Sequence, residues 1–291
     1  MKESSKQMRL AFILAVSLCG ASVASAQAPT TPPQQSPAPA QAPADKPSAP
    51  QVAPLTLDSA PPPVNAEEEA AIKIFRDAPK EDSAKKGQIA DEFLQKYPQG
   101  RYRAEIYSWQ VQLYLNQGQI DKMEAAGDKE LEITPNDPLT LAIIGSTLPR
   151  AMNSSTPEPQ KRLAKAEQYC QKALDLLPTI PKLESLTDAQ FQQAKNQVSA
   201  MAYSGLGTVA FRRGKFAEAI PNFEQALKVD TQQDPVNYYL LGICDEKASH
   251  FDDAVTAFTK CAAIPGPAQA TCTHSIDEAK KLAATQLSAP K

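Results

Sequence analysis

The chain repeats itself at a fixed spacing, and this restricts its fold more than any other feature. Segments 203–227 and 238–262 carry similar residue types in the same order. A separation of 35 residues holds for five pairs: Gly207 and Gly242, Phe216 and Phe251, Ala219 and Ala254, Phe223 and Phe258, and Ala226 and Cys261. A period of this length is typical of repeat architectures, in which each unit buries its apolar face against its neighbours.

Each repeated unit has the pattern of two packed helices. Gly207 and Gly242 are expected on the inner face of a first helix, where the missing side chain lets a second helix approach closely. The small Ala219 marks the crossing point, and Phe223 fills the space beside it. Residues 213–215 and 248–250 are expected to form the turns between the helices. The repeat therefore predicts stacked helical hairpins.

The residue types also follow a fixed order, which is clearest over residues 200–267. The order is an aromatic residue, a Leu-Gly pair, a small Ala, an aromatic residue and a second Ala before a Pro. This order resembles the tetratricopeptide repeat family. Segment 104–137 resembles it less closely, since Val111 and Met123 stand where Gly and Ala are expected. Segment 138–180 carries extra residues around 151–159, which read as an inserted loop.

The resemblance implies an all-α fold: an α-solenoid of about five helical hairpins with a C-terminal capping helix. The expected units are about 67–103, 104–137, 138–180, 187–234 and 235–266, with a cap at 267–285, in a folded region 65–287; residues 286–291 are expected to be a disordered tail. A capping box at Thr187 to Gln190 starts a first helix that runs unusually far, to about Arg212. The residues expected to pack the repeats are Gly145, Ala166, Leu206, Gly207, Ala219, Phe223, Ala226, Leu241, Gly242, Ala254 and Phe258.

The first 26 residues have the pattern of a secretory signal peptide. A positive stretch with Lys2 and Arg9 precedes the apolar run 10–18, and the small residues 24–26 favour cleavage before Gln27. The sequence therefore predicts export to the periplasm or beyond. Cys19 suggests lipid attachment as an alternative, although Leu18 stands where such motifs need a small residue. An uncleaved N-terminus would make the chain a membrane-anchored envelope assembly accessory factor.

Residues 27–64 differ sharply in composition from the remainder of the chain. Of its 26 prolines, 12 lie within residues 28–63, among Ala, Gln and Ser. Such a segment buries too little apolar surface to offset the entropy of ordering. It is expected to be a disordered, extended tether, with a proline-motif ligand for a partner as the alternative.

Charge and composition argue against several functions. A net charge of −3 does not indicate the positively charged surface that nucleic-acid binding requires. The two histidines, His250 and His274, have no companions at metal-ligand spacing, so no metal or cofactor is expected. No positioned base or phosphate loop stands out, and we expect neither an enzyme nor a small-molecule substrate. A thiol-based activity is the remaining enzymatic alternative.

Four cysteines follow the expected cleavage site: Cys170, Cys244, Cys261 and Cys272. An even count in an exported chain suggests disulfides. Cys261 and Cys272 flank a short turn with Pro265 and Pro267, and they are the expected pair. Cys170 and Cys244 fall on packing faces and are expected to be buried free thiols.

The resemblance also implies where partners bind, because first helices of this family line a concave groove. The groove positions here are Trp109, Leu139, Ile143, Met201, Phe211, Arg212, Tyr239, Leu240, Ile243 and Lys247. This set is mostly apolar and lacks the Lys/Asn/Arg clamp that would hold a terminal carboxylate. The sequence thus predicts a protein-protein interaction or scaffolding protein of the bacterial cell envelope, reaching a membrane only if its N-terminus is uncleaved. Alternatively, the long helix that starts after Thr187, or contacts between neighbouring repeats, cover this groove surface.

Overall fold

The computed structural model describes residues 64–79, 82–182 and 184–288, and side chains as far as residue 285. The expected signal peptide, nearly all of the expected tether, and residues 289–291 lie outside these ranges. Within them the regular structure is entirely helical, with 11 α-helices and one short 3-10 helix, η1 (Leu177–Thr179). The expectation of an all-α fold is confirmed.

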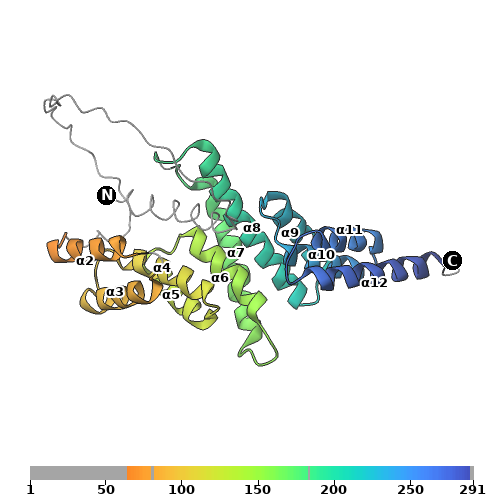
Figure 1. Cartoon of the computed structure of the whole chain (residues 1–291), viewed down its shortest axis with the longest axis horizontal. Coiled ribbons are helices and arrows are strands. Elements are labelled where there is room, and N and C mark those ends of the chain that lie inside the picture. Colours follow the sequence, from red (N-terminus) through yellow and green to blue (C-terminus); the bar gives the residue numbers. More distant parts are fainter. Residues whose placement is uncertain (1–63, 80–81, 183, 289–291) are drawn as a thin grey trace, which may run out of the picture.

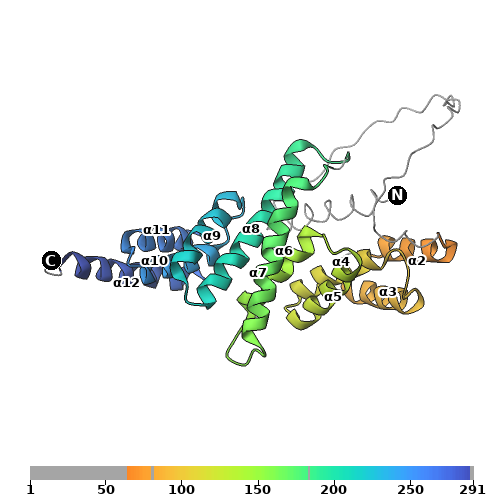
Figure 2. The ribbon, with the colours of Figure 1, turned by 180° about the vertical axis from the view of Figure 1, so that it is seen from behind.

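The helices pack in adjacent pairs that follow one another along the long axis of the molecule (Figure 1). The same order is visible from behind, with α2 near one end and α12 at the other (Figure 2). The pairs are α2 (Ala66–Asp77) with α3 (Ser83–Lys96), α4 (Arg103–Asn116) with α5 (Ile120–Ile133), α6 (Pro138–Ala151) with α7 (Pro159–Leu176), α8 (Asp188–Arg212) with α9 (Phe216–Val229), and α10 (Pro235–Lys247) with α11 (Phe251–Ala262). The last helix, α12 (Gln269–Ser288), packs on α11 and continues past residue 285, where we expected the cap to end.

Local sequence signals explain where several helices begin. Asp137 and Asp234 each precede a proline, and their side chains accept hydrogen bonds from backbone N–H groups of α6 and α10. Thr187 and Gln190 form a reciprocal capping box at the start of α8. Each cap satisfies backbone donors that a helix N-terminus leaves without partners.

The turns inside three pairs share one backbone conformation. Gly118 (φ 67°), Gly214 (φ 72°) and Ser249 (φ 65°) occupy equivalent places between α4 and α5, α8 and α9, and α10 and α11. This left-handed region costs glycine little, because it has no Cβ. Ser249 adopts the same left-handed conformation although it has a Cβ.

The largest core cluster extends from α4 to α8, and α6, α7 and α8 meet within it. A Cβ built on Gly145 of α6 would lie 2.5 Å from the Cys170 Sγ, and one on Gly205 of α8 would lie 2.4 Å from the same atom. Three helices can therefore approach one another here only because two positions lack a side chain. Of the expected packing residues, Leu206 is partly buried and all the others are buried.

Polar contacts join consecutive pairs in addition to apolar packing. Arg76 of α2 donates two hydrogen bonds, of 2.9 and 2.7 Å, to the carboxylate of Glu105 on α4. Lys165 of α7 bridges Glu124 and Asp128 of α5, each at 2.7 Å. Bidentate and networked ion pairs hold their geometry better than isolated surface pairs.

Candidate functional site

A cavity of about 740 Å³ lies between α6, α8 and the loop that joins α9 to α10. Leu115 of α4 and Ile120 of α5 close one side of it. The volume falls within the usual range for ligand-binding clefts, roughly 300 to 1,000 Å³. This cavity, called the α6–α8 cavity below, is the candidate functional site.

Helix α8 presents a polar face to the cavity. Gln193, Gln197, Met201 and Ser204 line it, at the spacing of one side of a helix. The opposite side of the same helix is buried in the core, where Val198 is 1% exposed. The core contact therefore fixes which side of α8 faces the cavity.

Arg150, in the last turn of α6, connects three helical pairs at the cavity wall. Its Nη1 lies 2.7 Å from the Asp234 carboxylate at the start of α10. Its Nη2 donates to the Ser204 Oγ and the Asn237 Oδ1, each at 2.6 Å. The Arg150 Nε is buried and has no hydrogen-bond partner among the described residues. Charge-assisted bonds of this kind are both strong and directional, so the network holds the wall in place.

The charges in the α6–α8 cavity are largely matched within the chain. Asp234 pairs with Arg150, and Asp230 accepts hydrogen bonds from the backbone N–H groups of Gln232 (2.8 Å) and Asp234 (3.0 Å). By contrast, in the described part of the chain no hydrogen bond engages the side-chain amides of Gln193 and Gln197. An amide offers two donors and an acceptor. The cavity therefore presents neutral hydrogen-bonding groups beside apolar side chains.

Several predicted groove residues contact other parts of the chain instead of open space. Leu139 (7% exposed) and Ile143 (2%) belong to the core, because α7 and α8 cover that side of α6. Trp109 packs edge-on against Phe75, with ring centroids 5.4 Å apart. The placement of Leu139 and Ile143 in a partner-binding groove is therefore wrong.

The C-terminal groove positions are partly covered by the last helix. Tyr239 and Ile243 pack in one cluster with Phe258 and with Ala279 of α12. Leu240 is partly buried in the cluster shared by α8, α9 and α10. Lys247 is exposed at the end of α10. Tyr239 and Ile243 thus have a packing role that their sequence positions did not reveal.

Phe211 and Arg212 also have partners within the chain. Phe211 packs edge-on against Phe216, with ring centroids 5.9 Å apart. Arg212 donates to the backbone carbonyls of Pro149 (3.0 Å) and Met152 (2.9 Å) at the end of α6. Among the described residues that line the α6–α8 cavity, Met201 is the one predicted from the sequence.

Sequence reasoning missed the polar residues of the cavity. Gln193 and Gln197 could have been found, because the capping box at Thr187 defines the register of α8. Arg150, Ser204 and Asn237 could not, because the contacts that join them span 33 to 87 residues. No local pattern encodes such distant contacts.

The four cysteines within the described residues are either disulfide-bonded or buried. Cys261 and Cys272 form a disulfide with a Cα–Cα distance of 5.9 Å. Cys170 and Cys244 are free and buried. Burial, with a contribution from Asp245, raises the pKa of Cys244 to about 12, and burial also raises that of Cys170. A thiol this hard to ionise is a poor nucleophile.

The described residues contain no group of three or more His, Cys, Asp or Glu arranged to hold a metal ion. None of their helices combines the length and the apolar character needed to cross a bilayer.

Comparison with known proteins identifies one repeat directly. Residues 200–233, which span the second half of α8 and all of α9, match the tetratricopeptide repeat family. No curated protein matches the sequence. Among solved structures, the MamA protein is 22% identical with a TM-score of 0.44, covering 63% of this chain and 84% of its own. PilW, described as a widely conserved type IV pilus biogenesis factor, is 16% identical with a TM-score of 0.47, covering 76% of this chain and 93% of its own.

Proposed function

This chain is a tetratricopeptide repeat protein, and we propose that it binds an extended segment of a partner protein in the α6–α8 cavity. Proteins built from stacked repeats are scaffolds that use their concave surfaces for binding. The general function, that of a protein-protein interaction scaffold, is inferred from the family. The binding surface is inferred from the α6–α8 cavity.

One observation carries the choice: two side-chain amides that no described residue engages face a cavity that also has apolar walls. Gln193 and Gln197 lie one turn apart on α8. An extended peptide exposes alternating backbone donors and acceptors, which primary amides can satisfy in pairs. Leu115, Ile120 and Met201 offer contacts for its apolar side chains. The matched charges of Arg150 and Asp234 favour an uncharged stretch of peptide.

The place of action is a separate proposal. The pattern of residues 1–26 supports export, and we propose that the chain works in the bacterial cell envelope, held away from its surroundings by residues 27–64. Mass spectrometry of the native N-terminus tests this. A first residue at Gln27 supports an exported chain without an anchor, whereas an intact N-terminus in the membrane fraction supports the anchored accessory factor.

Binding in the cavity is tested with peptides, because the partner is not known. A library of unstructured peptides displayed on phage is selected against the purified chain, and the affinity of the best peptide is measured by calorimetry. The double variant Gln193→Ala/Gln197→Ala removes both amides. Loss of two hydrogen bonds worth about 1 kcal/mol each predicts roughly 30-fold weaker binding.

Helix α8 provides a matched control. Gln192 and Asn196 lie in the N-terminal half of α8, as Gln193 and Gln197 do, but they are not among the residues that line the cavity. The Gln192 side-chain amide donates a hydrogen bond of 2.8 Å to the Asn196 side chain. Gln192→Ala/Asn196→Ala should leave the affinity unchanged. Equal losses in both variants, no loss in either, or a library that yields no binder would contradict the proposal.

A further inference from the structure

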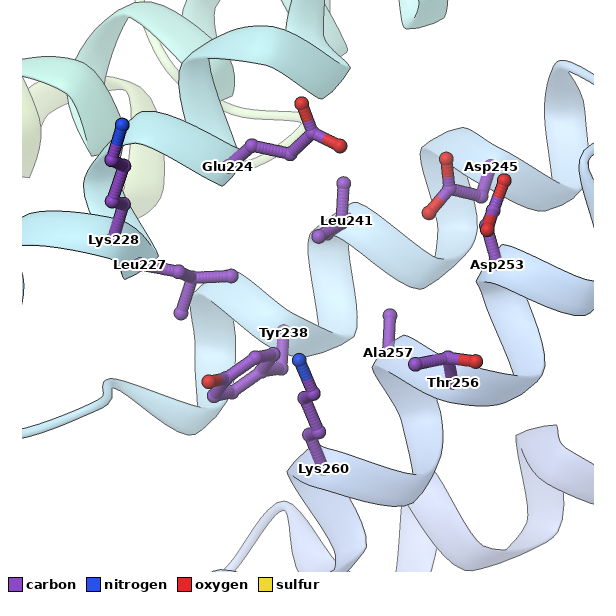
Figure 3. Close-up of a pocket in the computed structure, with 10 residues that line it drawn as sticks. All are labelled: Glu224, Leu227, Lys228, Tyr238, Leu241, Asp245, Asp253, Thr256, Ala257 and Lys260. Carbon is purple, nitrogen blue, oxygen red and sulfur yellow. The ribbon is translucent and has the colours of Figure 1, made fainter.

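A second cavity, of about 380 Å³, lies between α9, α10 and α11 (Figure 3). Leu227, Leu241 and Ala257 supply its apolar lining. The remaining side chains are mostly charged, and Figure 3 shows the two aspartates at one side of the view and Lys228 at the other. We call it the α9–α11 cavity.

The acidic end contains a carboxylate that the chain leaves without a hydrogen bond. The Asp245 side chain is 5% exposed, and the His250 Nδ1, which is charged only when protonated, lies 3.9 Å from its Oδ1. No described residue donates a hydrogen bond to this carboxylate. A carboxylate that is largely removed from water and receives no hydrogen bond is stabilised by a cation beside it.

Two more carboxylates add to the negative charge at this end. Asp253 of α11 and Glu224 of α9 line the same cavity, and no hydrogen bond or ion pair with a described residue engages either of them. Burial, and repulsion from Asp253 and Glu224, raise the pKa of Asp245 to about 6, against the opposing effect of His250. The three groups therefore act on one another through space.

Two lysines line separate parts of the cavity, Lys228 at the left of Figure 3 and Lys260 below the centre of the view. Lys228 of α9 has no ion pair among the described residues, and the Lys260 Nζ lies 5.8 Å from the centre of the Tyr238 ring. The α6–α8 cavity differs in this respect, because its Arg150 and Asp234 neutralise each other directly. In the α9–α11 cavity no ion pair among the described residues joins Lys228 to a carboxylate.

We propose that the α9–α11 cavity binds a small zwitterion with an apolar stem, its ammonium group among Asp245, Asp253 and Glu224 and its acidic group beside Lys228. An organic ammonium fits better than a metal ion, since no cluster of metal-ligating residues was found in the described ranges. An ammonium donates three hydrogen bonds, which suits three carboxylates. The stem would cover Leu227, Leu241 and Ala257, as long polar side chains cover apolar surface.

The first test uses ω-amino acids from 4-aminobutanoate to 8-aminooctanoate as probes, with hexylammonium and hexanoate as the two half-molecules. Binding to the purified chain is measured by calorimetry and by chemical-shift changes at pH 7.5. At least one ω-amino acid should bind tenfold more tightly than either half-molecule. Absence of saturable binding by every ω-amino acid overturns the proposal, and so does hexylammonium binding as tightly as the best of them.

Two neighbouring residues on α11 provide a matched pair of variants. Asp252 and Asp253 both lie in the first turn of the helix, but only Asp253 lines the cavity. Asp253→Asn should weaken binding of the best probe at least tenfold, while Asp252→Asn should leave it unchanged. Lys228→Met should weaken binding of the zwitterion and leave binding of hexylammonium unchanged. Equal effects of Asp253→Asn and Asp252→Asn overturn the proposal.

Discussion

Gly207 of α8 lies directly against the ring of Phe223 on α9. A Cβ built on Gly207 would come within 2.8 Å of the Phe223 Cδ1, and the equivalent pair one repeat later, Gly242 and Phe258, would leave 2.6 Å. Real side chains do not approach so closely. The glycine found at 207 and again 35 residues later at 242 is therefore required by a close approach between helices.

This relationship predicts that Gly207→Ala destabilises the chain by about 1 to 3 kcal/mol, because the ring or the helix must move. Urea unfolding followed by circular dichroism measures the effect. Gly87, inside α3, is the control, since nothing lies within 4 Å of a Cβ built there. Gly87→Ala should stabilise by about 0.5 to 1 kcal/mol through helix propensity. Similar losses in both variants would contradict the steric explanation.

Arg150 should contribute more to stability than exposed ion pairs do. Arg150→Met leaves the buried Ser204 and Asn237 without their charged partner, and we expect a loss of about 2 kcal/mol in the free energy of unfolding. Lys129→Met removes an exposed pair with Glu132 on α5 and should change stability by less than about 0.5 kcal/mol. A loss at Arg150 no larger than that at Lys129 would show that the network is unimportant.

Asp245 should make stability depend on pH. Burial raises its pKa in the folded state to about 6 from the usual 3.8, so the folded chain binds a proton more tightly than the unfolded chain. Its contribution is most favourable below pH 4 and is lost as the pH rises through 6. Asp245→Asn should therefore be nearly neutral at pH 4 and stabilising at pH 7, by on the order of 1 to 3 kcal/mol. Denaturant unfolding at both pH values measures this, and a difference that does not change with pH would refute it.

The disulfide should hold α12 onto the end of the stack. Cys261 and Cys272 close a loop with a sequence separation of 11. Restricting a loop of this size in the unfolded chain is worth about 3 kcal/mol. Cys261→Ala/Cys272→Ala should speed hydrogen exchange in α12 and leave α2 and α3, at the other end, unchanged. Equal protection of α12 in both proteins would show that apolar packing alone holds the helix.

Most of the fold was predictable because its signals are local. Helix starts at Asp137, Thr187 and Asp234 follow from caps within a few residues of sequence, and the pairing of helices follows from the 35-residue repeat. A cap or a turn depends on neighbours along the chain, so it can be recognised without knowing where the rest of the molecule lies. The unusual length of α8 was likewise evident from the capping box.

The candidate site was predicted far less well, because exposure is a property of the assembled stack. Leu139 and Ile143 occupy positions that would face the groove in a regular array, but the long α8 and its partner α7 bury them. Tyr239 and Ile243 pack toward α12, whose position depends on helix packing and a disulfide.

The sequence alone determined that the chain forms paired helices, where several of them start, and which small residues allow them to meet. The tertiary structure alone decided which of their faces remain open, that Arg150 meets Asp234, and that Asp245, Asp253 and Glu224 line one cavity. Helix formation is governed by neighbours a few residues away, whereas a binding surface depends on the angles at which separate helices pack.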